Sequence, residues 1–362
     1  MGRSRVLRRA TVSAFLAAFV LAADRSNTRL RLAPQVRLTG VQPSAFTPPR
    51  SDEPTSVSMR NVGFRVADGI VLRIHRLDGV MRGTKNGIVD FDDKSSYVTE
   101  IVSGEVGLTG PDLTNLMNRY VFAYAGAPLK HLRLEIRGNQ LRQTGIMHKG
   151  VDIPFDMIAE VTLTADNRIR IHPTRMRILG VNGAALMKAF DLTLEKLLNL
   201  SKAKGITVRD NDLFLEPTDV LPPPTIRGRV TAVRFAGDEL VQIFGSADTA
   251  ALAARGMTPP DASARNYMYY RGGTLHFGKL FMADAEMLVV DQDLSDPFDF
   301  DNDHYHRQLI AGSSRTLPSL GLEVYMPDAA KVKDVSTSTS PRTARTSEAR
   351  SDAGVKAPPH PR

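Results

Sequence analysis

Apolar and polar residues alternate along most of the middle of the chain, which is the period of a β-strand with one buried face. Residues 132–137 show this pattern, and Gly138-Asn139 then turns the chain into a second run at 140–148. Short turns between consecutive runs favour antiparallel hairpins. The pattern predicts strands at or within these residues: 59–66, 70–80, 95–108, 132–137, 140–148, 161–164, 168–172, 206–209, 212–215, 226–235, 239–244, 267–290 and 320–325.

Two segments carry a helical period instead. The first helix is predicted over 111–123, because Thr109 can cap it and Pro111 fits the first turn. The second is predicted over 183–200, where large apolar residues recur at three- and four-residue steps behind Asn182. Strands that follow strands through short turns indicate an α+β fold. We expect a long curved antiparallel β-sheet wrapped around one or two amphipathic helices.

The two ends of the chain differ from its middle. Four arginines precede an apolar run of 14 residues at 10–23, which suits a signal peptide better than a membrane span. We therefore expect a signal peptide at 1–23, with an uncleaved anchor as the alternative. A disordered linker rich in Pro, Ser and Arg is expected at 24–56, a single α+β domain at 57–328 and a disordered basic tail at 329–362. The predicted location is the periplasm or cell envelope.

Composition narrows the possible functions. The chain has 42% hydrophobic residues, enough for a sizeable core, and no cysteine, which excludes disulfides and thiolate chemistry. Its net charge of +8 lies at the ends, because residues 51–328 hold 31 basic and 35 acidic residues. A mildly acidic domain is a poor match for the phosphate backbone. We expect no nucleic-acid partner.

Four segments in order carry a resemblance to a known family. They are a strand segment at 165–174, the leucine-rich segment at 182–200, a hairpin at 205–217 and a second hairpin at 226–244. This order resembles the bacterial LmeA-like phospholipid-binding family, which is related to the tubular lipid-binding (TULIP-like) domains. The resemblance covers about residues 105–245.

The resemblance implies a non-catalytic protein without a cofactor that binds a lipid or other amphiphile in an apolar groove between the curved sheet and the helix. Peripheral contact with a membrane surface is a further expectation, because the ends are basic. Flexible methionines suit irregular acyl chains, and this chain has 13. The predicted apolar lining is Leu116, Met117, Val161, Leu163, Ile169, Ile171, Leu186, Met187, Phe190, Leu194, Leu197 and Leu198.

An acidic stretch at 291–306 supports an alternative function. Carboxylates at two-residue spacing resemble the start of a calcium loop, although a histidine stands where such a loop needs glycine. The same stretch could hold a transition metal for an envelope hydrolase or another metal-dependent enzyme, or it could be a solvated loop. A second alternative is an envelope scaffold or interaction protein. The candidate metal ligands are Asp299, Asp301, Asp303, His304 and His306.

Overall fold

The computed structural model describes residues 53–178, 181–183, 193–245 and 257–332. These residues belong to one compact unit and are mostly β-strand, in sheets of eleven, seven and three strands. Within them, no helix is both long enough and apolar enough to span a membrane. The predicted signal peptide, most of the predicted linker and most of the predicted tail lie outside the described residues.

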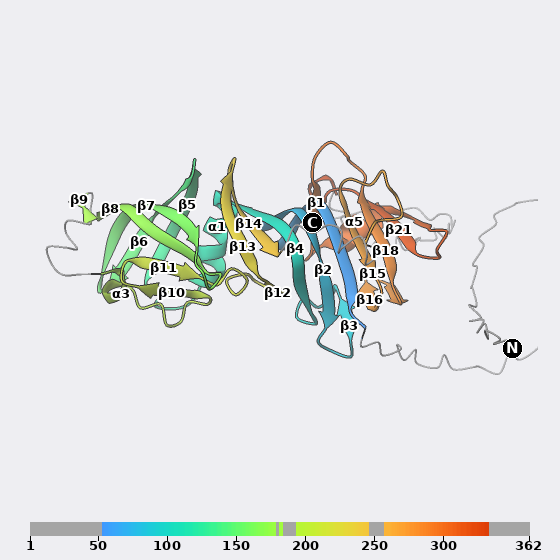
Figure 1. The fold of residues 1–362 in the computed structure, drawn as a ribbon, viewed down its shortest axis with the longest axis horizontal. Coiled ribbons are helices and arrows are strands. Elements are labelled where there is room, and N and C mark those ends of the chain that lie inside the picture. Colours follow the sequence, from blue (N-terminus) through green and yellow to red (C-terminus); the bar gives the residue numbers. More distant parts are fainter. Residues whose placement is uncertain (1–52, 179–180, 184–192, 246–256, 333–362) are drawn as a thin grey trace, which may run out of the picture. The chain divides into compact units, whose positions relative to one another are not determined.

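The eleven-stranded sheet joins the two ends of the described chain. β1, in blue, lies beside β15, in orange, so that an early strand pairs with a late one (Figure 1). The spatial order is β13-β14-β4-β2-β1-β15-β18-β21-β20, with β12 parallel to β4 and β19 parallel to β1. The strands are β1 (Thr55–Ala67), β2 (Ile70–Gly83), β4 (Tyr97–Thr109), β12 (Thr225–Gly228), β13 (Val230–Ala236), β14 (Glu239–Gly245), β15 (Tyr267–Arg271), β18 (Glu286–Asp291), β19 (Phe298–Asp301), β20 (Ser313–Thr316) and β21 (Leu322–Met326).

The seven-stranded sheet is built from neighbouring hairpins and is antiparallel throughout. Its order is β10-β11-β8-β7-β6-β5, with β9 beside β8. Its strands are β5 (Leu129–Arg137), β6 (Gln140–Lys149), β7 (Val151–Leu163), β8 (Ile169–Ile178), β9 (Val181–Asn182), β10 (Ile206–Arg209) and β11 (Asp212–Leu215). The small sheet contains β3 (Ile88–Asp90), β16 (Thr274–Phe277) and β17 (Leu280–Ala283).

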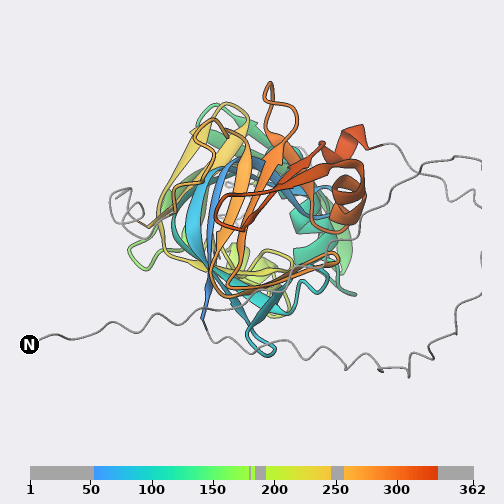
Figure 2. The same cartoon turned by 90° about the vertical axis from the view of Figure 1, so that its right-hand side faces the viewer.

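The first predicted helix is confirmed. The Thr109 hydroxyl accepts the Asp112 N–H at 3.3 Å, and the Asp112 carboxylate accepts the Thr109 N–H at 3.1 Å, which forms a capping box. The π-helix η1 continues the chain after α1, and α5 lies beside β21 (Figure 2). The described helices are α1 (Gly110–Leu116), η1 (Met117–Val121), α3 (Leu194–Leu197), α5 (Tyr305–Ala311) and the 3₁₀ turn η2 (Ala329–Lys331).

A single helix over 183–200 is wrong. Thr193 is extended, with φ −118° and ψ 162°, and its hydroxyl accepts the Lys196 N–H, so that it caps a new helix, α3. The chain is extended again at Leu198. A threonine side chain that bonds to the backbone favours such a cap over a helix interior. Residues 184–192, which include three of the predicted lining residues, lie outside the described residues.

The folded region is slightly longer than predicted at both ends. β1 begins at Thr55, inside the predicted linker. η2 lies inside the predicted tail, and Lys331 forms ion pairs with Asp293 and Asp328. The large curved antiparallel sheets with few helices agree with the α+β prediction. Buried apolar residues of the eleven-stranded and seven-stranded sheets belong to one continuous core.

Candidate functional site

Three small apolar cavities lie inside this core. Cavity I, of about 40 Å³, lies among β1, β2, β4, β12 and β14. Cavity II, of about 50 Å³, lies among α1, η1, β4 to β6, β8, β10, β11 and β14. Cavity III, of about 30 Å³, lies among β5 to β8, β11 and α3. Each exceeds the ~10–15 Å³ that holds one water molecule, and cavities walled by apolar groups stay dry.

Neighbouring cavities share walls. Cavities II and III are both lined by Leu129, Gln143 and Leu213. Cavities I and II are both lined by Gln242. The three cavities therefore form one series through the core, which we call the apolar row.

Strand alternation explains how the apolar row is lined. On β14, Leu240 lines cavity II, Gln242 lines cavities I and II, and Phe244 lines cavity I. These three positions share one face of the strand and span ~13 Å. On β4, Val106 lines cavity I and Leu108 lines cavity II. The inward faces of the strands thus lead from one cavity to the next.

Gln242 is the most unusual residue of the apolar row. It is 5% exposed, and its Oε1 has no hydrogen-bond partner among the described residues. A buried acceptor without a partner costs about 1–3 kcal/mol. Sequence reasoning missed Gln242, because a polar residue within an alternating strand resembles one on the solvent face. Its neighbours Val241 and Ile243 carry the only signal, since apolar residues on both sides indicate that either face of this strand is buried.

The structure brings part of the predicted lipid lining together. Leu116, Met117, Ile169 and Ile171 line cavity II. Leu194 and Leu198 line cavity III. Three further residues are half-buried and pack against the core without lining a cavity: Val161, Leu163 and Leu197. The last three predicted residues lie outside the described part of the chain: Leu186, Met187 and Phe190.

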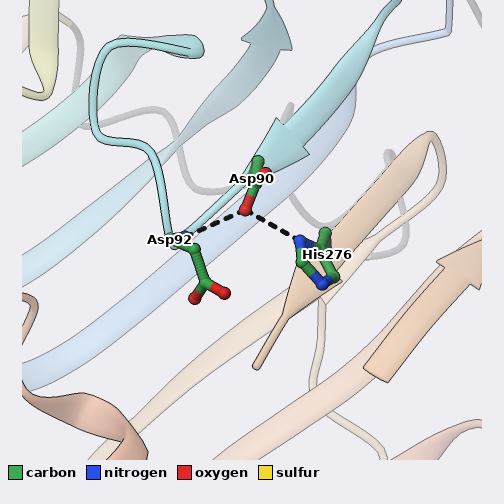
Figure 3. A group of neighbouring side chains, drawn as sticks. All are labelled: Asp90, Asp92 and His276. Carbon is green, nitrogen blue, oxygen red and sulfur yellow. Dashed lines mark hydrogen bonds and ion pairs between the residues drawn. The ribbon is translucent and has the colours of Figure 1, made fainter. Parts of the chain in front are cut away.

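Phe91 is part of the wall of cavity I. Its backbone N–H donates to the carbonyl of His276 at 3.0 Å. The flanking carboxylates point to the other side of the chain. Asp90 Oδ1 lies 2.8 Å from Nδ1 of His276 and also accepts the Asp92 N–H at 2.9 Å (Figure 3). This cross-strand pair fixes the chain on both sides of Phe91.

A second set of bonds holds Asp92. Its carboxylate accepts the Tyr305 hydroxyl and lies 3.2 Å from Nε2 of His306. Burial, the bond to Asp92 and the nearby carboxylates raise the pKa of Tyr305 far above its ordinary value, so the hydroxyl stays protonated and donates. Phe91 is therefore held between two hydrogen-bonded carboxylates.

The group around Phe91 also has the donors of a metal site. Ligand atoms of Asp90, Asp92 and His276 lie within 4.8 Å of one another (Figure 3). Carboxylate oxygens and an imidazole nitrogen are ligands of zinc and related metals. Here the side chains are part-exposed, and hydrogen bonds within the group engage both carboxylates and His276. The geometry accounts for the position of Phe91 without a further ligand.

The predicted metal ligands of the acidic stretch are not gathered into one site. Asp299 pairs with Arg65 at 3.0 Å. Asp303 pairs with Lys94 at 2.6 Å. Both carboxylates therefore already face a positive side chain.

Of the remaining three candidates, two lie together and the third lies elsewhere. Asp301 accepts backbone N–H groups at the start of α5 and lies 3.2 Å from Nδ1 of His304. His306 turns toward Asp92 instead. The five candidate ligands of the alternative metal site are therefore not brought together as one set.

A different carboxylate group surrounds Lys331. Asp291, Asp296 and Asp328 have ligand atoms within 4.8 Å of one another. The Lys331 ammonium lies 2.8 Å from Asp328 and 3.8 Å from Asp296. Hydrogen bonds to Asp293 and Asp328 raise the pKa of Lys331. The chain's own cation therefore offsets part of the negative charge of this group.

Asp291 gives a pH-dependent prediction. Burial and the nearby Asp328 raise the pKa of Asp291 from 3.8 to about 6. The native state then holds this proton more tightly than the unfolded state, so the stabilisation is present below about pH 4 and is lost as the pH rises through 6. From pH 4 to pH 7 the wild type is expected to lose about 2–3 kcal/mol relative to Asp291→Asn. Urea unfolding at both pH values measures this, and equal pH dependence of the two proteins would contradict it. The exposed Asp284→Asn is the control.

An open polar groove of about 460 Å³ is the candidate site for the alternative hydrolase function. His75 Nε2 lies 2.7 Å from Oε2 of Glu239, which resembles a base held by a carboxylate. The Thr109 hydroxyl also lines the groove, but it donates to Asp112 in the capping box. The lining residues of this groove therefore offer His75 no free hydroxyl to activate.

Comparison with protein-family models, with curated proteins and with solved structures finds no match for this chain. The resemblance to the LmeA-like family stays a prediction. The fold and site define a β-rich protein whose core contains a series of adjacent apolar cavities. The functional proposal therefore rests on these cavities.

Proposed function

We propose that this protein binds one amphiphile and encloses the apolar part of that molecule in the apolar row, without catalysis. The observation that carries the proposal is the sharing of walls between three apolar cavities in one core. Unfilled apolar space lowers stability by ~24 cal/mol per Å³, and protein interiors otherwise pack as densely as organic crystals. A bound hydrocarbon would fill this space and recover the lost contacts.

The walls suit a chain of variable shape. Methionine is flexible and polarisable, and it repacks around irregular apolar groups. Burial of each methylene contributes ~0.8 kcal/mol, so that each enclosed methylene strengthens binding about fourfold before ordering costs. The methionines that line the apolar row are Met59, Met81, Met117, Met147, Met157 and Met176.

Two helices complete the proposed site. α1 provides Leu113 and Leu116 to cavity II, and α3 provides Leu194 to cavity III. The sequence predicted a sheet wrapped around one or two amphipathic helices. In the proposed site, the cavities instead lie between the sheets and two short helices. The predicted signal peptide and basic ends extend the proposal to an exported protein that takes its ligand from a cell-envelope membrane.

Native mass spectrometry of the full chain tests the proposal. After purification under mild conditions, we expect a bound mass that organic extraction releases as an amphiphile. Delipidated protein should also bind a fluorescent fatty acid at micromolar concentration, and octadecanoic acid should displace it. An apo mass in repeated preparations, together with no binding of the fluorescent probe, would overturn the proposal.

A further inference from the structure

The unpartnered amide oxygen of Gln242 indicates which polar group the ligand carries. Gln242 is 5% exposed, lines cavities I and II, and leaves Oε1 without a partner. Most buried polar groups in proteins are hydrogen-bonded, so an exception calls for a missing partner. Gln242 stands at the place where one apolar cavity meets the next, with Leu240 and Phe244 on either side along β14.

A water molecule in cavity II is a poor partner for Gln242, because buried water needs two to four polar neighbours. Among the described residues that line cavity II, the one other polar side chain is Gln143, which lies at the opposite junction with cavity III. Thr99 and Tyr97 add two hydroxyl-bearing side chains to the walls of cavity I. A polar group of the ligand at the junction therefore satisfies Gln242 better than a water trapped in cavity II.

A hydroxyl is the group that fits. The oxygen and nitrogen of a glutamine amide can exchange places by a flip, so the partner should be able both to donate and to accept. A hydroxyl does both and carries no charge, whereas a carboxylate would need a buried cation. The described residues that line cavities I and II include no charged side chain.

We propose that the ligand is an amphiphile with a hydroxyl inside its hydrocarbon chain, and that this hydroxyl pairs with Gln242 while apolar portions on either side occupy cavities I and II. The inference rests on the proposed function and names the ligand class of the same site. It also accounts for a polar residue at the junction, because a leucine there would bind a plain chain equally well.

Displacement of a fluorescent fatty acid from the delipidated full chain tests this. The competitors are octadecanoic acid and a series of its positional hydroxy isomers. At least one isomer is expected to bind about five- to tenfold more tightly than octadecanoic acid, since a hydrogen bond contributes about that much. Gln242→Leu should abolish this preference and still bind octadecanoic acid. Gln140→Leu on β6, outside the walls of the apolar row, is the control and should keep the preference, and Gln143→Leu tests the polar side chain at the other junction.

The outcomes separate the two proposals. If the wild type binds none of the competitors or the probe, the proposed function fails. If it binds octadecanoic acid and every isomer equally, the function stands and the hydroxyl inference is overturned. If Gln143→Leu removes the preference and Gln242→Leu does not, the assignment of the hydroxyl to Gln242 is wrong.

Discussion

Replacement of Phe91 by alanine is expected to lower the free energy of unfolding by about 4 kcal/mol, the middle of the range for buried phenylalanine. Phe91 is 1% exposed and lines cavity I. Alanine there would leave a void that the surrounding sheets cannot fill. The five rings whose centroids lie within 6.5 Å of the Phe91 ring would lose their contacts: Tyr97, Tyr270, Phe277, Phe300 and Tyr305.

Phe214 provides a matched control for this substitution. Its ring is half-buried on β11 and lies under the guanidinium group of Arg168, 4.8 Å from the ring centroid. Phe214→Ala makes the same chemical change outside the tight aromatic cluster and is expected to cost about 1 kcal/mol. Urea unfolding of both variants measures the difference. Equal losses of unfolding free energy in the two variants would show that the rings around Phe91 do not increase the stabilisation it provides.

Local patterns predicted the hairpins well. The ranges predicted for 206–209 and 212–215 are those of β10 and β11, because a hairpin needs only neighbouring residues and a suitable turn. The capping box at Thr109 was predictable for the same reason, because it depends only on the types and spacing of neighbouring residues. Local rules end where the partner comes from far along the chain.

Long-range pairing accounts for what the sequence could not show. β1 pairs with β15 over its first half and with β19 over its second half. No period in the sequence indicates that His276 stands opposite Asp90, or that Gln242 lies between two cavities. The positions of these residues depend on pairing between distant strands. Alternation predicts which face of the sheet a side chain lies on, but it does not predict which residues lie beside it.

The arrangement of the candidate metal ligands has a specific physical cause. Carboxylates at every second position resemble a calcium loop, but two residues is also the period of a strand. Phe298 and Phe300 are fully buried on β19, so Asp299 and Asp301 lie on its other face. There both carboxylates pair with Arg65, at 3.0 and 3.8 Å. The spacing therefore indicated the outer face of a strand.

Replacement of Leu213 by tryptophan is expected to weaken binding of octadecanoic acid by about tenfold or more. Leu213 is 7% exposed and lines both cavities II and III, so a larger ring there would fill their junction. A hydrocarbon chain cut off from one cavity loses ~0.8 kcal/mol for each methylene that it no longer buries, and two such methylenes already give about tenfold.

The next residue of β11 supplies the control that separates a blocked site from a damaged fold. Phe214 faces away from the apolar row and is absent from its walls, so Phe214→Trp should bind octadecanoic acid as the wild type does. Overpacking at Leu213 costs about 1–3 kcal/mol, and thermal unfolding would confirm that the variant is still folded. Displacement titrations on both variants then decide. A folded Leu213→Trp protein with unchanged affinity would mean that the ligand does not pass from cavity II to cavity III, and the apolar row would not be one binding site.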